Sequence, residues 1–210
     1  GFDIAHLHRR DRSGFKAGAL NAALPHATGE YVAMFDADFC PQPDFLRRTV
    51  PYLAADTRLA YVQARWGHLN DGYSLLTRAQ SIALDGHFAV EHPARERAGL
   101  LSTFNGTGGV WRRESILRSG GWDPAQLTED VDLAYRAQLA GWRGLTVPGV
   151  AAPAELPAQV PAFRQQQSRW ARGNTQCLLK LGWPLARAPL PLAARLQGLI
   201  HLSNYLAHPL

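Results

Sequence analysis

Two aspartates one residue apart follow an apolar stretch in the first quarter of the chain. Residues 31–38 read Tyr-Val-Ala-Met-Phe-Asp-Ala-Asp, so the stretch ends in Asp36 and Asp38. Successive strand side chains alternate between faces, so this pair can project to one side, beyond the carboxyl end of a sheet. Two carboxylates this close repel each other unless a cation shares them, and oxygen ligands suit Mg²⁺ or Mn²⁺ with phosphate oxygens. The alternative is an ordinary loop with two solvated aspartates.

A second acidic group lies in the middle of the chain. Thr128 is followed by Glu129, Asp130 and, one residue further, Asp132. Thr128 can cap a helix, and carboxylates in a first turn are stabilised by the helix dipole, so capping alone would explain this composition. The same placement offers a general base if the start of the helix faces a ligand crevice.

Two further stretches combine residue types that suit ligand binding. Residues 164–173 read Arg-Gln-Gln-Gln-Ser-Arg-Trp-Ala-Arg-Gly. Here Arg169 can contact phosphate, and Trp170 can stack on a sugar ring or, more commonly for tryptophan, pack in the core. Residues 104–109 read Phe-Asn-Gly-Thr-Gly-Gly, where glycines either let the backbone approach a ligand or simply form a tight turn.

The pattern around these residues predicts an α/β sheet. We expect strands at 2–8, 31–36, 59–65, 109–111, 143–147 and 150–152, and helical segments at 13–24, 44–55, 74–91, 112–119, 128–141 and around 164–173. Strands that alternate with helices along the chain predict right-handed parallel crossovers.

The composition is that of a globular chain with one sizeable core. Of 210 residues, 46% are hydrophobic and 19% are charged, which excludes a mainly disordered chain. The net charge of +5 suits a nucleotide or anionic lipid headgroups, but no basic run is dense enough to indicate nucleic acid. Cys40 and Cys177 lie far apart and form no metal or redox motif, which indicates a reducing compartment.

The C-terminal stretch is apolar but interrupted. Residues 189–210 are rich in Leu and Ala and also contain Arg195, Gln197, His201 and Asn204. They fall short of the ~20 apolar residues of a membrane-spanning helix. We therefore expect an amphipathic helix at a membrane surface, or the start of a span. Because residue 1 lies within a strand-like pattern, we also expect the chain to be a piece of a longer protein.

In their order and combination, these motifs resemble the processive family 2 glycosyltransferases, namely cellulose synthase and the cellulose-synthase-like mannan and glucan synthases. The family's D-x-D, T-E-D and Q-(Q/R)-x-R-W motifs match residues 36–38, 128–130 and 166–170. Its K-A-G-x-x-N segment matches residues 16–21. Residues 104–107, 109–112, 120–122 and 155–157 are similar to the cellulose-synthase-like members in particular.

The resemblance implies a GT-A fold, Rossmann-like, with a mostly parallel sheet flanked by helices. It also implies inverting transfer of a hexose from a UDP-glucose or GDP-mannose type of donor to a growing β-glycan. Residues 1–182 would form a catalytic domain without its first nucleotide-binding strand, and residues 183–210 an interface helix or the start of a transmembrane region. The parent would be an integral membrane protein, held by flanking helices, with this domain on the cytoplasmic side.

Residue roles carried over from the resemblance divide one site into three parts. Asp130 would be the general base, with Glu129 shaping the site, and Asp36 and Asp38 would hold Mg²⁺ or Mn²⁺. The donor would be bound by Lys16, Asp36, Asp38, Gln166, Arg169 and Trp170. The acceptor would be bound by Phe104, Asn105, Gly106, Thr107 and Trp170.

Three alternative functions remain open. A non-processive family 2 transferase acting on a lipid or saccharide is disfavoured by the Gln-Gln-x-Arg-Trp motif. A catalytically silent glycan-binding fragment is disfavoured by the presence of Asp36, Asp38 and Asp130. A metal-dependent phosphatase or nucleotidyltransferase would share the Asp-x-Asp pair but leaves residues 128–130 unexplained.

Overall fold

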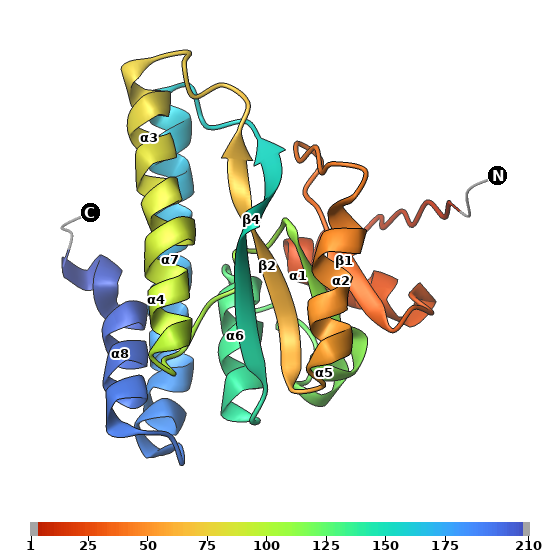
Figure 1. The fold of residues 1–210 in the computed structure, drawn as a ribbon, viewed down its shortest axis with the longest axis vertical. Helices are drawn as coiled ribbons and strands as arrows, with labels where there is room; N and C mark the ends of the chain where they lie inside the picture. Colours follow the sequence, from red (N-terminus) through yellow and green to blue (C-terminus); the bar gives the residue numbers. More distant parts are fainter. Residues whose placement is uncertain (1–3, 208–210) are drawn as a thin grey trace.

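The computed structural model describes residues 4–207, in which four strands form one mixed sheet (Figure 1). The strand order is β1 (Tyr31–Met34), β3 (Gly109–Arg112), β2 (Leu59–His68) and β4 (Arg143–Ala154). β4 pairs parallel to β2, whereas β3 pairs antiparallel to both β1 and β2. Three of the four strands therefore run in one direction, as the α/β prediction requires, and β3 is the exception.

The reversed direction of β3 brings a distant loop to the functional edge of the sheet. Because β3 is antiparallel, the loop before it lies beside the carboxyl ends of β1 and β2. Gly108 fixes this loop to both strands: its N–H donates to the Met34 carbonyl at 2.9 Å, and its carbonyl accepts from Ala64 N–H at 3.0 Å. Parallel crossovers alone, as predicted from the element order, would not have placed the loop there.

Helices cover both faces of the sheet (Figure 1). They are α1 (Phe15–Ala23), α2 (Phe45–Ala55), α3 (Leu75–Gly86), α4 (His92–Arg97), α5 (Arg113–Arg118), α6 (Glu129–Leu139), α7 (Val160–Arg187) and α8 (Leu192–Ser203). Tyr61 and Trp111 pack with α1, α5 and α6, whereas the next residue pair, Val62 and Val110, packs with α2 on the opposite face. This alternation is the period of two that a sheet buried on both faces requires.

The C-terminal helices add a third apolar cluster. α7 packs between α6 and α8 through the buried side chains Tyr135, Cys177, Leu181, Leu185 and Leu202. The predicted domain boundary after residue 182 falls inside α7. α8 is followed by a 3₁₀ turn (Asn204–Ala207), and residues 208–210 of the predicted C-terminal helix lie outside the described part. No helix within residues 4–207 is both long enough and apolar enough to cross a membrane.

Three local predictions differ from the structure. The strand predicted at 2–8 is wrong for residues 4–8, which form no regular element because they have no strand to pair with; residues 2 and 3 lie outside the described range. The two strands predicted at 143–152 are one strand, β4, with an irregularity opposite the step from Ala64 to Arg65. The segment predicted to be helical at 74–91 is helical but not uniform: α3 ends at Gly86, and a π-helical turn (His87–Glu91) leads directly into α4.

Candidate active site

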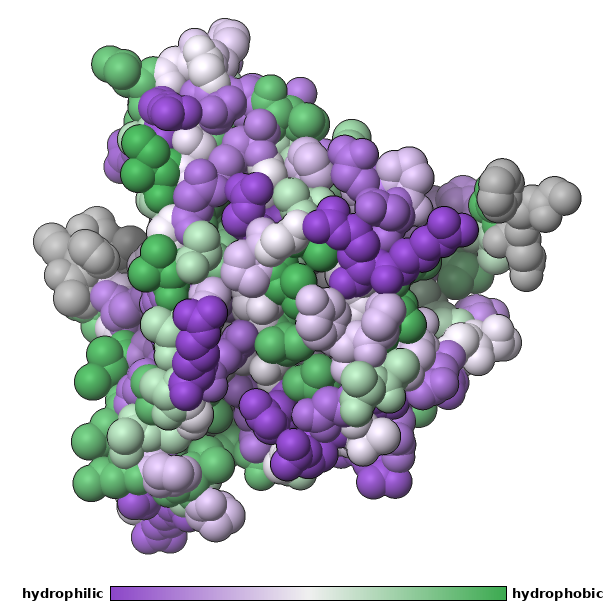
Figure 2. Space-filling view, in the orientation of Figure 1, coloured by the Kyte–Doolittle hydropathy of each residue, from purple (hydrophilic) through white to green (hydrophobic). Residues whose placement is uncertain are grey.

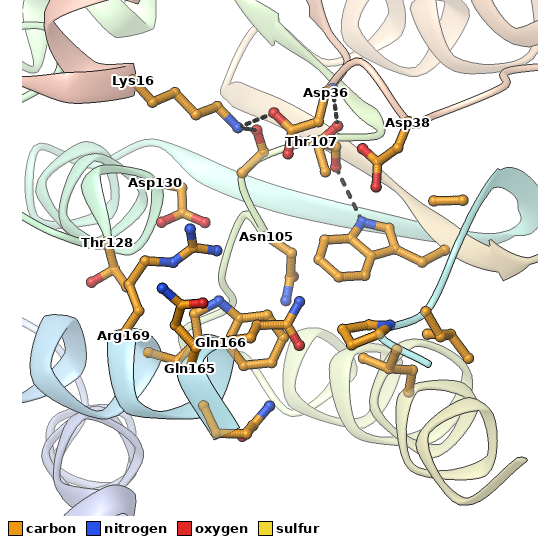
Figure 3. Close-up of a pocket in the computed structure, with 18 of the residues that line it drawn as sticks. Lys16, Asp36, Asp38, Asn105, Thr107, Thr128, Asp130, Gln165, Gln166 and Arg169 are labelled. Atoms are coloured by element: carbon orange, nitrogen blue, oxygen red, sulfur yellow. Dashed lines mark hydrogen bonds and ion pairs between the residues drawn. The ribbon is translucent and has the colours of Figure 1, made fainter. Parts of the chain in front are cut away.

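A cavity of about 1200 Å³ opens at the carboxyl ends of β1 and β2, between α1, α3 and the start of α6 and α7 (Figure 3). Segments far apart in the sequence supply its chemically active side chains. Those that line it are Lys16, Asp36, Asp38, Trp66, Asn105, Thr107, Glu129, Asp130, Gln166, Arg169 and Trp170. Nearly all of the predicted site residues therefore converge on one space.

Asp36 is held in the cavity wall by two neighbouring segments. The Lys16 ammonium lies 2.5 Å from Asp36 Oδ1 and also donates to the Gly106 carbonyl at 2.9 Å. The Asp36 N–H donates to Thr107 Oγ1 at 2.8 Å. Asp38 is exposed at the same side of the cavity, as the alternation after β1 predicts (Figure 3). Lys16 is predicted to contact the nucleotide of the donor. In the structure it contacts Asp36, the carboxylate predicted to hold the metal and the donor.

The acidic group at the start of α6 divides into functional and structural members. Asp132 is fully buried and pairs with Lys180 and Arg136, each at 2.6 Å, so its role is structural. Glu129 and Asp130 line the cavity. Thr128 occupies the N-cap position, but the predicted side-chain cap is wrong: its hydroxyl lies 3.5 Å from Cys177 Sγ and makes no capping hydrogen bond.

Burial controls the ionisation of the two cavity acids. Burial, reinforced by the adjacent Asp130 charge, raises the pKa of Glu129 to about 7. Burial also raises the pKa of Asp130, opposed by the N–H of Val131 and by the Lys16 ammonium. Burial thus favours the protonated form of both acids, and the Lys16 ammonium favours their ionised form.

We expect transfer to depend on pH through these two acids. A general base must be deprotonated, so the raised pKa values of these two acids mean that activity is present at high pH and is lost as the pH falls through the raised values. Lys16→Met removes the ammonium that lowers both pKa values, so the acid limb of kcat/KM should move to higher pH. A limb that stays in place in the variant would contradict this assignment.

α7 presents one face to the cavity. Gln166, Arg169 and Trp170 are three and four residues apart, hence on one side of the helix, and Arg169 points toward Asp130 (Figure 3). Gly173, one turn further, lies against the start of α6, where an added Cβ would be 2.4 Å from Thr128 Cγ2. The absence of a side chain at Gly173 therefore lets the Arg-Trp face approach Glu129 and Asp130.

Gly173→Ala tests this close approach. The added methyl group must displace Thr128 or α7, and overpacking of this kind costs about 1–3 kcal/mol. We expect a lower melting temperature and a transfer rate reduced by about tenfold. Gly182→Ala is the matched control on the same helix, because its Cβ would meet Leu178 at an ordinary 3.5 Å. Equal stability and activity of the two variants would show that α7 does not depend on Gly173.

The loop before β3 contributes three of its four predicted acceptor residues. Asn105, Gly106 and Thr107 line the cavity. Gly106 has a φ of +82°, and a Cβ added there would lie only 2.9 Å from Asp130 Oδ2, so a side chain has no room. Phe104 does not fit its predicted role. Its side chain is fully buried in the core, with ring centroids 5.5 Å from Tyr61 and 5.3 Å from Trp111. Phe104 is an anchor for the loop, because a neighbouring residue on an extended chain points to the opposite side.

Two residues that hold this loop were missed by sequence reasoning. The buried Gln63 amide donates to the Thr107 carbonyl at 3.0 Å and accepts from Asn105 N–H at 2.9 Å. Trp66 Nε1 donates to the Thr107 carbonyl at 3.3 Å. A glutamine inside the otherwise apolar run 59–64 was the available signal, because a buried amide needs partners.

The mixed sheet, the aspartate pair after β1 and the acidic start of α6 define a domain with a GT-A-like fold, and solved structures share it. The mannosyltransferase PcManGT from Pyrobaculum calidifontis, in complex with GDP-Man and Mn²⁺, has a TM-score of 0.67 and 26% identity, over 97% of this chain and 51% of that chain. S. aureus TarS 1–349 in complex with UDP-GlcNAc shares the fold at a TM-score of 0.62 and 16% identity, over 92% of this chain and 53% of that chain.

The chain belongs to the glycosyl transferase family group 2, whose model matches residues 31–210. It is 43% identical over 190 residues to glucomannan 4-beta-mannosyltransferase 1 of Oryza sativa subsp. japonica, covering 89% of this chain and 36% of that protein. It is 42% identical over 191 residues to glucomannan 4-beta-mannosyltransferase 7 of Arabidopsis thaliana, covering 90% and 34%. The chain thus spans about a third of the length of these relatives, and the predicted family and fold are confirmed.

Proposed function

We propose that this domain transfers a mannosyl residue from GDP-mannose to a growing β-glycan, with inversion at the anomeric carbon. The observation that carries the proposal is the convergence of paired aspartates, a candidate base and an Arg-Trp helix face on one cavity. The names of the 42–43% identical relatives support mannose over glucose. GDP-Man in the structure of PcManGT supports the same donor class.

The cavity geometry supports a single displacement with one base. Asp130 lies between Gly106 and the α7 face and would take the proton from the attacking acceptor hydroxyl. Arg169 would bind the donor diphosphate, and Trp170 would offer an apolar platform to a pyranose ring. No protein nucleophile is needed, because inversion requires only one displacement.

The residues present fit a divalent cation that is held jointly with the donor. Within residues 4–207, no cluster of three or more His, Cys, Asp or Glu side chains could hold a metal by itself. Asp36 and Asp38 supply hard oxygen ligands, and diphosphate oxygens would supply others. We propose Mn²⁺ or Mg²⁺ there, which would neutralise charge on the leaving diphosphate. Without a cation, the diphosphate would meet two carboxylates, of which only Asp36 has Lys16 beside it.

A donor screen with linkage analysis tests this function. Membranes from cells expressing the protein are incubated with GDP-mannose, UDP-glucose and other labelled nucleotide sugars, with the Asp130→Asn variant as the background. We expect incorporation from GDP-mannose into a β-linked polymer. Incorporation from UDP-glucose alone would overturn the donor assignment, α-linked product would overturn inversion, and addition of single sugars would support a non-processive transferase instead.

A second proposal concerns the membrane. Leu192, Leu196 and Ile200 on α8 follow each other every four residues, and each is more than half exposed. Figure 2 shows hydrophobic side chains gathered on this edge of the molecule. We propose that α8 lies on a membrane surface and that the parent is an integral membrane protein with this domain on its cytoplasmic side. Ile200→Glu should reduce cosedimentation with lipid vesicles, whereas Leu117→Glu on α5 should not.

A further inference from the structure

A second, smaller cavity adjoins the main one. Its volume is about 210 Å³, and it shares with the main cavity the wall residues Trp66, Leu84, Asn105, Thr128, Asp130 and Trp170. His87 and Glu91 line its far side. Neither residue belongs to a motif that indicated function in the sequence. The candidate base Asp130 and the loop residue Asn105 therefore share this second cavity with an imidazole and a carboxylate.

The π-helical turn after α3 creates this arrangement. In a π turn, residues five apart lie on one side, and such turns are frequent at functional sites. His87 and His92 consequently face each other, with ring centroids 4.2 Å apart and Nε2 atoms 2.9 Å apart. Burial lowers the pKa of His92 well below its usual range, so His92 is a neutral wall that fixes the position of the His87 ring.

Glu91 determines which His87 nitrogen carries a hydrogen. Glu91 Oε2 lies 2.6 Å from His87 Nδ1, and its other oxygen pairs with Arg95. The hydrogen bond from His87 lowers the pKa of Glu91 to about 2, so Glu91 is a carboxylate and can only accept. His87 Nδ1 is thus the donor to Glu91. In the tautomer with its single hydrogen on Nδ1, His87 Nε2 is an acceptor that His92 Nε2, at 2.9 Å, and the Asn105 side chain share.

His87 Nε2 faces the side chain of Asn105. The Asn105 amide nitrogen lies 3.1 Å from it and donates to it. This contact orients the amide, so that Asn105 Oδ1 faces away from the ring; that oxygen has no hydrogen-bond partner within residues 4–207. An unpaired acceptor in a wall shared with Asp130 is a site for a hydroxyl donor, because a buried acceptor without a partner is destabilising and buried polar groups are normally hydrogen-bonded.

We propose that His87, with its tautomer fixed by Glu91, is a positioning residue that holds the Asn105 amide in the orientation that accepts a hydroxyl of the acceptor sugar. This role rests on the proposed transferase function. His87 acts through Asn105, and Asn105 acts on the acceptor. In the donor half of the site, Asp36 is held by Lys16 and Thr107 and not by the side chains of His87 or Asn105.

A double-mutant cycle between His87→Leu and Asn105→Ala tests the proposal. Each single variant should raise the KM for the acceptor about tenfold and leave the KM for GDP-mannose unchanged. Because one residue acts through the other, the double variant should be about as impaired as either single variant. Multiplied effects of about 100-fold, or an equal rise in the donor KM, would show a merely structural role. His87→Gln, whose amide oxygen can accept from Asn105, should partly restore the acceptor KM.

A readout without turnover separates this inference from the proposed function. In protein labelled with ¹⁵N-asparagine, the Asn105 side-chain amide, identified by its absence in Asn105→Ala, should exchange slowly with solvent. Faster exchange in His87→Leu, at an unchanged melting temperature, supports the contact. Unchanged exchange overturns it. A wild-type protein that makes no product but shows this exchange difference would remove the transferase proposal and its acceptor role while leaving the positioning contact intact.

Discussion

Replacing Asp130 by asparagine is expected to lower kcat by about 10²–10⁴-fold, the usual contribution of a general base, while donor affinity changes little. The substitution preserves the size of the side chain but removes its ability to accept the acceptor proton. Of the three acids in this turn, Asp132 is paired with two cations and is therefore not available as a base. Asp130 is the one whose carboxylate lies beside Gly106, and Arg169 points toward it (Figure 3).

The effect of Asp130→Asn is compared with that of a control variant that loses a carboxylate outside the cavity. Asp44→Asn, an exposed position before α2, removes one carboxylate outside the cavity and should transfer at the wild-type rate. Donor binding is followed by calorimetry with GDP-mannose, and turnover by release of GDP. A turnover of Asp130→Asn within tenfold of wild type would exclude Asp130 as the base. Loss of donor binding in parallel would assign it to the donor site instead.

The second large effect is expected at Asp38. Asp38→Asn should weaken GDP-mannose binding in the presence of Mn²⁺ by at least about tenfold, to the affinity that wild type has in EDTA. The reason is that Asp36 already has Lys16 at 2.5 Å, so Asp38 is the carboxylate free of that ammonium and most dependent on a metal. The losses of GDP-mannose affinity caused by Asp38→Asn and by EDTA should not be additive, because each removes the same interaction.

The control for Asp38→Asn is the response of donor binding to EDTA in a variant outside the cavity. Asp44→Asn should keep the full response to EDTA. If Asp38→Asn responds to EDTA as strongly as wild type, Asp38 does not hold the metal. If neither protein responds to EDTA, the donor site works without a divalent cation and Lys16 is the principal counter-charge of Asp36.

Several features of this protein follow from local sequence. The order and spacing of the motifs at 36–38, 128–130 and 166–170 predicted the family and the fold, which the family match and the solved structures confirm. Asp36 and Asp38 follow a strand, and Gln166 shares a helix face with Arg169 and Trp170, three and four residues further on, because strand and helix periodicity are properties of neighbouring residues. Periodicity predicts which residues lie on the same face of a strand or helix, but not what that face contacts.

Tertiary structure alone decided how these residues divide their tasks. Phe104 and Asn105 are adjacent, yet one is a core anchor and the other a cavity wall, because the antiparallel β3 fixes which side of the loop meets Tyr61. Asp130 and Asp132 are similarly close, yet Lys180 on α7 neutralises only Asp132 of the two. Lys16 meets Asp36 across 20 residues of sequence, and Gln63 meets the loop across more than 40. Sequence patterns specify the chemistry of side chains and their local spacing. Long-range packing decides which charges and hydrogen-bond partners surround them, and therefore which of several similar residues can act.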